Sequence, residues 1–330
     1  MDEFTLIDRL VSALNGQDAG PAVVLGPGDD AAVLRVQEGV ELVGSLDTLV
    51  ADVHFPVSAP PLLIGYRAMM VSLSDLAAMG AQPHYALVGL TLPRNDVEWV
   101  QQLARGMSLA SAAADCPLPG GNLARGPLNI SVSVHGTVPA GQALRRSGAQ
   151  PGDLIMVSGD LGGAAMALQL PELDQPPSFA ELNKLGPADE LYALRRYFLP
   201  EARIELGMAL RGLASSVIDV SDGLLADLGH LCSAGGVGAR LELSTLPALQ
   251  GAGLSRVLTG GDDYELCFTL PPASRQAVTD VAGRLGIPLS EIGRIEPGSQ
   301  LVLYEQGQLY AEPYELAPSA DTSGRGFRHF

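Results

Sequence analysis

The sequence is almost without lysine. Lys184 is the only lysine among 330 residues and Leu185 follows it, so the chain contains no Gly-Lys-Ser/Thr phosphate-binding loop. The lysine that a protein-kinase site requires is missing for the same reason. Schiff-base chemistry would depend on Lys184 alone, and its Leu-Gly-Pro surroundings are typical of a surface loop. Three common routes to phosphate or carbonyl chemistry are therefore nearly excluded.

Basic residues, cysteines and long apolar runs are also scarce. Arginine and lysine total 20 against 37 acidic residues, and the formal net charge of -17 argues against a nucleic-acid or anionic-membrane surface. Cys116, Cys232 and Cys267 are far apart in apolar surroundings, which predicts reduced core residues. No apolar run reaches the roughly 18 residues that cross a bilayer, and the N-terminus lacks a signal-peptide pattern. We expect a cytoplasmic protein that binds neither nucleic acid nor membrane.

Apolar residues, by contrast, are abundant enough for two cores. Hydrophobic residues make up 47% of the chain and charged residues 17%. Repeating strand and helix patterns predict an α/β fold of the α+β type, with two domains of mixed sheet packed with helices. The stretch 141–152 contains glycines, a proline and two arginines, and it is the predicted boundary between domains 1–140 and 141–330.

Short acidic segments recur beside apolar runs and are predicted to form turns. They are Gly26–Val33, Ser45–Thr48, Ser72–Asp75, Asp219–Asp222 and Gly260–Asp263. Carboxylates that converge repel one another unless a cation lies between them, and hard oxygen ligands suit Mg²⁺ better than zinc or copper. The pattern predicts a nucleotide site with several Mg²⁺ ions.

Two of these carboxylates have more than one interpretation. A helix is predicted from Pro60 to Met79, apolar almost all round and therefore buried, with Asp75 inside it. A buried carboxylate must be hydrogen-bonded, paired or metal-bound, so Asp75 either bonds a neighbouring serine or ligates a metal. Asp222 either caps the helix that follows it or joins Asp219 at a strand end, where open α/β sheets bind ligands.

Glycines and arginines give weaker signals. The pair Gly120–Gly121 permits close approach of a ligand, although such a pair is more often only a turn. The segment Gly159–Gly163 could direct backbone amides at a phosphate. Arg145 and Arg146 are either solvated linker charges or phosphate ligands.

Several long segments, in this order, resemble the thiamine-monophosphate kinase family, part of the superfamily named for aminoimidazole ribonucleotide synthetase. They are GPGDDAAV, SLDTLVADVHF, VSLSDLAAMG, GGNLARGPL, RRSGAQPGD, IDVSDGLLADL, GGDDYELCF and GFRHF. The resemblance implies the fold of that superfamily and the ATP-dependent phosphorylation of thiamine monophosphate to thiamine diphosphate by direct, in-line, Mg²⁺-assisted transfer. It also implies several Mg²⁺ ions, ATP as co-substrate and a homodimer.

The resemblance further implies roles for individual residues. It places Asp30, Asp75 and Asp219 at the catalytic centre. The implied Mg²⁺ ligands are Asp30, Ser45, Leu46, Asp47, Asp75, Asn122, Asp219 and Asp222. The implied ATP contacts are Gly121, Asn122, Arg146 and Ser221, and the implied substrate contacts are His54, Asp263 and Phe327. Outside that context His54 would be a structural histidine and Phe327 an ordinary packing aromatic.

Two residues depart from the family pattern. Leu46 stands where a threonine is expected, so only its backbone carbonyl could bind a metal. Asn122 stands where an aspartate is expected, and without the negative charge that metal should be held more weakly or through water. Two alternatives follow: another ATP-dependent enzyme of the superfamily or, because of Leu46 and Asn122, a nucleotide-binding protein with reduced turnover.

Overall fold

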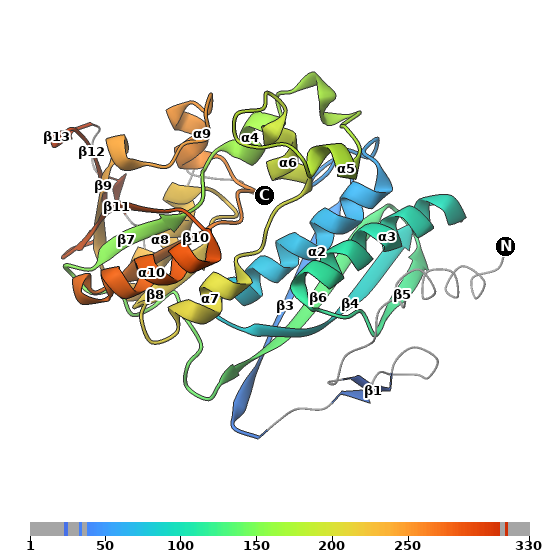
Figure 1. The fold of residues 1–330 in the computed structure, drawn as a ribbon, viewed down its shortest axis with the longest axis horizontal. Coiled ribbons are helices and arrows are strands. Elements are labelled where there is room, and N and C mark those ends of the chain that lie inside the picture. Colours follow the sequence, from blue (N-terminus) through green and yellow to red (C-terminus); the bar gives the residue numbers. More distant parts are fainter. Residues whose placement is uncertain (1–22, 26–32, 35–37, 311–313, 316–330) are drawn as a thin grey trace.

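The computed structural model describes residues 23–25, 33–34, 38–310 and 314–315 (Figure 1). It contains two large mixed sheets with their own helices, and this confirms the predicted α+β class. Strands β1 (Val23–Leu25) and β2 (Val33–Leu34) form a separate antiparallel pair. Asp30 and Phe327, two residues that the resemblance places in the site, lie outside the described residues.

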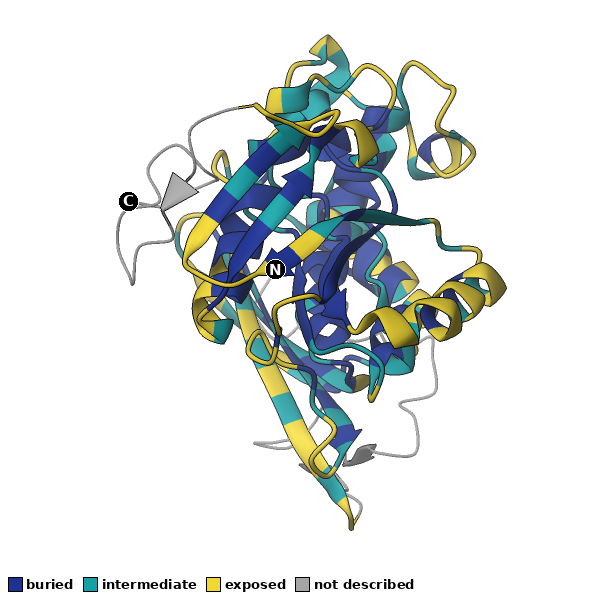
Figure 2. Ribbon diagram, turned by 90° about the vertical axis from the view of Figure 1, so that its left-hand side faces the viewer, coloured by how far each residue is buried: buried dark blue, intermediate teal, exposed yellow. Residues whose placement is uncertain are grey.

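The first sheet has the order β3-β6-β4-β5, and helices cover one of its faces. The strands are β3 (Val40–Val50), β6 (Asn129–Pro139), β4 (Gln82–Leu92) and β5 (Gly120–Arg125). Strand β6 alternates in burial, and Val132 and Val134 pack on that face against α2 (Pro61–Ala78) and α3 (Val97–Ala114). The opposite face is open along β3, where Leu42 and Leu46 are 56% and 64% exposed (Figure 2).

Helices α2 and α3 cross at very short range because each has a glycine at the crossing point. A Cβ atom on Gly65 would lie 2.1 Å from the carbonyl oxygen of Leu103, and one on Gly106 would lie 1.9 Å from that of Leu62. The predicted helix after Pro60 is confirmed. Helix α2 is buried along nearly all its length, so its few polar side chains must find partners inside the protein.

The second sheet lies between helices on both faces. Its order is β13-β12-β9-β11-β7-β10-β8, with β14 beside β12. The strands are β7 (Leu154–Ser158), β8 (Ser216–Asp219), β9 (Gly238–Glu242), β10 (Leu266–Leu270), β11 (Leu289–Glu296), β12 (Gln300–Glu305), β13 (Gln308–Leu309) and β14 (Tyr314–Glu315). Helix α8 (Leu224–Gly235) packs on one face, and α7 (Ile204–Leu210) and α10 (Arg275–Leu285) pack on the other with the end of α2.

Helix α2 therefore contributes to the cores of both halves. Four shorter helices complete the fold: α4 (Gly163–Ala167), α5 (Phe179–Leu182), α6 (Tyr192–Phe198) and α9 (Leu254–Thr259). Leu194 and Phe198 of α6 join the core around α2 and α3, although they follow the predicted boundary at 140/141. None of the helices in the described ranges is long and apolar enough to cross a membrane.

Three local predictions were wrong, and two elements were missed. Ser72–Asp75, predicted as a turn, lies within helix α2. Ser45–Thr48 is the middle of β3 rather than a turn, because all of Val40–Val50 pairs with β6. The loop expected around Gly120–Gly121 is the edge strand β5, and Gly121 lies so close to the carbonyl of Val88 that a Cβ would clash. Strand β9 and helix α9 were not predicted.

We expect Gly106→Ala to destabilise the protein by about 3 kcal/mol, because the added methyl group would push α2 and α3 apart. Gly283→Ala is the matched control: Gly283 lies in α10 with no atom within 4 Å of its Cβ position. The control should gain about 0.5–1 kcal/mol. Urea unfolding measures both, and equal effects would show that the helices do not need the glycine.

Candidate active site

Carboxylates from β3, α2 and β8 converge where the two sheets meet. On β3, Ser45 and Asp47 lie on the face toward α2, and Ser45 donates a hydrogen bond to Asp75 of that helix. The next residue toward the helix N-terminus, Ser74, donates to Oδ2 of Asp219 at 2.6 Å. The hydrogen-bond partner of Asp75 is thus a distant serine, and not the neighbouring serine considered from the sequence.

Burial and the nearby Asp75 carboxylate raise the pKa values of two aspartates in this group. Burial and the Asp75 carboxylate raise the pKa of Asp219 to about 7, although the Ser74 hydrogen bond and the Arg146 charge oppose the shift. Burial and Asp75 likewise raise the pKa of Asp47 to about 6, against a hydrogen bond from Ser72. Each group would therefore gain from a nearby cation.

The donor set fits Mg²⁺ that arrives with a phosphate ligand better than a resident ion. In the part of the chain that the structure describes, no three side chains of His, Cys, Asp or Glu form a ready-made metal site. Mg²⁺ commonly takes only one or two carboxylates and completes its shell with waters and substrate phosphates. Asp47, Asp75 and Asp219 are the described residues that could supply those carboxylates.

A buried aspartate, Asp227, fixes the backbone of the loop between β8 and α8. One oxygen of Asp227 accepts hydrogen bonds from the backbone amides of Ser221, Asp222 and Gly223 at 3.1, 3.0 and 3.0 Å. Gly223 is the N-cap residue, so Asp222 does not cap α8. Asp222 is half-buried, and its carboxylate and that of Asp219 both add to the rise that burial causes in the pKa of Asp227.

Within one chain, the side chain of Leu46 points away from the carboxylates, and Asn122 lies at the far edge of the first sheet. Strands β3 and β5 are the two outer strands of the first sheet, about 14 Å apart by strand spacing. The pairing Thr48–Ser131–Gly89–Asn122 puts Asn122 on the open face of the sheet, with the side chain of Leu46. Gly121 is at the same distant edge as Asn122. The exposed Arg146, by contrast, is close enough to Asp219 for its charge to oppose the rise in the pKa of that aspartate.

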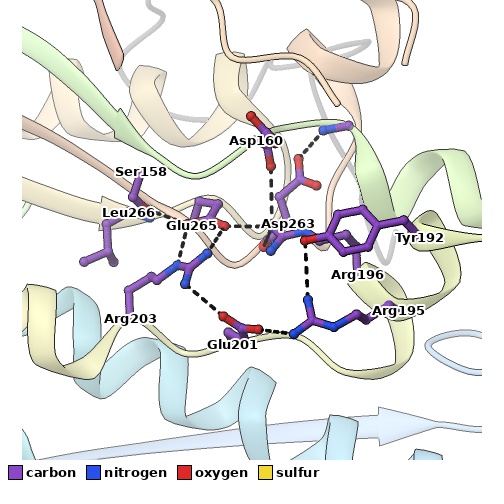
Figure 3. A network of polar contacts seen from close by, with 11 residues as sticks. Ser158, Asp160, Tyr192, Arg195, Arg196, Glu201, Arg203, Asp263, Glu265 and Leu266 are labelled. Atoms are coloured by element: carbon purple, nitrogen blue, oxygen red, sulfur yellow. Dashed lines mark hydrogen bonds and ion pairs between the residues drawn. The ribbon is translucent and has the colours of Figure 1, made fainter. Parts of the chain in front are cut away.

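Asp263 is part of a buried polar network (Figure 3). Its Oδ2 accepts the amide hydrogen of Gly162 at 2.7 Å, while its Oδ1 is buried without a hydrogen-bond partner. Burial raises the pKa of Asp263 to about 7. The glycine-rich turn considered as a phosphate site therefore directs its Gly162 amide at Asp263.

Two arginines neutralise the neighbouring carboxylate of Glu265. Burial alone would raise its pKa, but Arg196 at 2.8 Å and Arg203 at 2.6 Å hold the pKa below its usual value. Arg196 also donates to the backbone oxygen of Asp263 at 3.1 Å. Figure 3 shows that these arginines come from the segment of α6 and α7, so the network fixes that segment against β10.

His54 lies in the loop after β3. Its Nδ1 accepts the amide hydrogen of Val50 at 3.0 Å, and its backbone oxygen accepts from the Tyr197 hydroxyl at 2.9 Å. These bonds orient the half-buried ring and attach the loop to α6.

Sequence reasoning missed several residues that hold the site together. Ser74 and Asp227 lie inside segments that were singled out, VSLSDLAAMG and IDVSDGLLADL, and their polar side chains in apolar helices were the available signal. Glu265 likewise follows the Gly-Gly-Asp-Asp-Tyr segment directly. The arginine partners of Glu265 lie some sixty residues away, and no local pattern identifies them.

The sequence matches two family descriptions in succession. Residues 28–138 match "AIR synthase related protein, N-terminal domain" and residues 150–305 match "AIR synthase related protein, C-terminal domain". The chain is 40% identical over 304 residues to the thiamine-monophosphate kinase of Salmonella typhimurium, covering 89% of this chain and 90% of that protein. It is 41% identical over 306 residues to the enzyme of the same name from Escherichia coli K12, with the same coverage.

Solved structures agree with these matches. A thiamine-monophosphate kinase from Stenotrophomonas maltophilia superposes with a TM-score of 0.79 at 40% identity, covering 94% of this chain and 98% of that one. A structure described as AaThiL complexed with AMPPCP and TMP gives 0.71 at 28% identity, covering 95% and 96%. The hydrogenase maturation protein HypE of E. coli gives 0.71 at 20% identity, which shows a shared fold alone.

We expect Asp219→Asn to stabilise the metal-free protein at pH 8 by about 1–3 kcal/mol. The folded-state pKa of Asp219 is about 7, above the unfolded value of about 3.9, so the native state retains a proton that the unfolded chain releases. Its ionisation therefore lowers stability as pH rises from about 4 to 8, and the asparagine removes that loss.

Urea unfolding in EDTA at pH 5 and pH 8 measures the effect, which should shrink at pH 5. Asp280→Asn, on the exposed face of α10, is the matched control and should change stability little at either pH. A variant no more stable than the wild type at pH 8 would contradict the raised pKa of Asp219.

Proposed function

Because this chain belongs to the thiamine-monophosphate kinase family, we propose that it transfers the γ-phosphoryl group of ATP to thiamine monophosphate, giving thiamine diphosphate and ADP. The observation that carries the proposal is the identity of 40% over nine-tenths of the chain with a relative of that name, together with the convergence of Asp47, Asp75 and Asp219.

The acceptor in this reaction needs no general base. The second pKa of a phosphate monoester is about 6, so the attacking oxygen is already largely deprotonated at neutral pH. The two substrates are both polyanions, so the protein must suppress their repulsion and align them in line. This fits a site built from acidic side chains and arginines, without lysine.

Mg²⁺ would supply charge neutralisation between the phosphates. We propose Asp47, Asp75 and Asp219 as its principal ligands, with Asp222 beside them and Asp30 and Ser45 completing the set. The hydrogen bonds from Ser45 and Ser74 fix the orientations of two of these carboxylates before any ligand binds. Ser221, on the loop held by Asp227, and Arg146 are proposed nucleotide contacts.

The proposed contacts of the thiamine substrate are His54, Asp263 and Phe327. The unpartnered Oδ1 of Asp263 supports a role in accepting a hydrogen bond. Asp263 is only 2% exposed, so this contact requires the surrounding loops to move when substrate binds.

We also propose a homodimer formed through the open face of the first sheet. Leu42 and Leu46 are exposed apolar residues on this face, and the ring of His135 stacks on Tyr85 there at 4.5 Å. Within one chain, Gly121 and Asn122 lie on β5, at the opposite edge of the sheet from Asp47 on β3. In the proposed dimer these two residues contribute to the nucleotide site of the other copy. The buried, unpaired cysteines are consistent with the proposed cytoplasmic location.

Two alternatives remain distinct from this proposal. A different ATP-dependent member of the superfamily would turn over another substrate, such as formylglycinamidine ribonucleotide. A nucleotide-binding protein with reduced turnover would bind ATP and form no diphosphate product. Product analysis with ATP, Mg²⁺ and each acceptor separates all three.

We expect the wild-type protein to form thiamine diphosphate and Asp75→Asn to lower kcat/KM at least about 100-fold with an unchanged circular dichroism spectrum. An active Asp75→Asn enzyme would contradict the assignment of the carboxylates, whereas an inactive wild type would contradict the function itself.

Asn122→Asp should keep or raise the affinity for Mg²⁺, because it restores a negative charge.

We expect Leu42→Glu to weaken the dimer at least about tenfold, because it places a charge in the proposed interface. Leu309→Glu is the matched control, since Leu309 is similarly exposed, at 55%, on strand β13 of the second sheet. Sedimentation equilibrium measures both dissociation constants. A wild-type monomer, or equal effects of the two substitutions, would contradict a dimer through this face.

A further inference from the structure

Arg67 is a buried arginine of α2 to which the reaction assigns no role. Its side chain is 2% exposed and lies at the junction of the two halves of the protein. Its Nη1 donates to the backbone oxygen of Tyr197 at 2.8 Å, and its Nη2 lies 2.7 Å from Oδ1 of Asp262. The guanidinium also stacks over the ring of Tyr197, 4.1 Å from its centroid, and lies 5.9 Å from that of Tyr264.

The loop that Arg67 contacts has an unfavourable backbone. Asp262 and Tyr264 have φ angles of 69° and 51°, in the left-handed region that side-chain-bearing residues rarely adopt. Such a conformation persists only where the surroundings hold it. Here Asp262 Oδ1 accepts from both Arg67 and the Tyr264 hydroxyl, the latter at 2.9 Å.

The same loop lies against the proposed nucleotide loop. The amide of Asp262 donates to the oxygen of Ser221 and that of Tyr264 to the oxygen of Val220, both at 2.8 Å. A Cβ on Gly261 would lie 2.4 Å from the Ser221 oxygen, so the two segments are in direct contact there. Asp263, a proposed substrate contact, is between the two strained residues.

Helix α2 connects this loop with the carboxylates. Arg67 and Asp75 are eight residues apart on one helix, about 12 Å along its axis. The helix is buried between two cores and therefore rigid. The Arg67–Asp262 ion pair consequently fixes the loop bearing Asp263 at a set distance from Asp75. In-line transfer is sensitive to this distance, because a 1 Å misplacement can cost about 100-fold in rate.

We propose that Arg67 is a positioning residue for the acceptor substrate, acting through Asp262 on the loop 260–264. The inference rests on the proposed function and adds to it a residue that touches neither substrate. The loss of Arg67 should let the loop relax toward ordinary backbone angles, which displaces Asp263 and leaves the carboxylates of β3, α2 and β8 in place.

The test is steady-state kinetics of Arg67→Met, which retains the buried apolar length of the side chain. We expect the KM for thiamine monophosphate to rise about tenfold or more, with the KM for ATP within about twofold of wild type. Arg67→Lys should recover only part of the loss, because lysine keeps the charge and lacks the planar fork that both bonds and stacks. Arg240→Met, which removes a similar stacking contact with Tyr304 in the second sheet, is the matched control and should leave both constants unchanged.

A double variant separates positioning from simple stability. Adding Asp262→Asn to Arg67→Met removes the charge left unpaired, so thermal stability should recover while the KM for thiamine monophosphate stays high. Hydrogen exchange gives a readout independent of activity: the amides of Asp262 and Tyr264 should exchange faster in Arg67→Met than in wild type.

Two results would overturn the proposal: a wild-type KM for thiamine monophosphate in Arg67→Met, or equal rises in both KM values that disappear when stability is restored. If the wild type forms no thiamine diphosphate, the proposed function fails, and the exchange rates still show whether Arg67 holds the loop.

Discussion

Charge buried along helix α2 is the constraint on which the arrangement of the site depends. The helix is apolar on nearly every side, yet it carries Arg67, Ser74 and Asp75. A charged or polar group in such surroundings is costly unless it finds a partner. All three partners come from other segments: Asp262, Asp219 and Ser45. The polar requirements of one helix therefore fix where β3, β8 and the loop 260–264 lie.

The same arrangement keeps the ligand-free protein in an unfavourable electrostatic state. Burial and mutual repulsion raise the pKa of Asp47 to about 6 and that of Asp219 to about 7, so ionisation near neutral pH opposes folding. The serines can orient these carboxylates but cannot neutralise them. A cation bound with a phosphate ligand would relieve the repulsion, and that relief would contribute to binding. The folding free energy that this repulsion costs is thus regained when the cation binds.

The sequence predicted the elements with regular apolar patterns and failed where the pattern is reversed. Helix α2 follows its expected span, because a proline opens it, a glycine follows it and the run between them is apolar almost all round. Strand β3 was predicted only in part. Its apolar Leu46 faces solvent while the polar Ser45 and Asp47 face α2, so the segment 45–48 has the polar composition that is typical of a turn. The contacts of Arg67 with residues almost two hundred positions away depend on tertiary packing, which no local pattern reports.

The two departures from the family pattern lie on the same face of the first sheet. Leu46 and Asn122 lie on the open face of the first sheet, at its two opposite edges, while Asp47 and Asp75 lie on the covered side. Asn122 is therefore too far from Asp47 to change the charge of the cluster within one chain. In the proposed dimer through the open face, Leu46 and Asn122 both belong to the surface that the second copy covers. The carboxylates that face α2 would then keep their full charge, and the changes would affect only what meets them across the dimer.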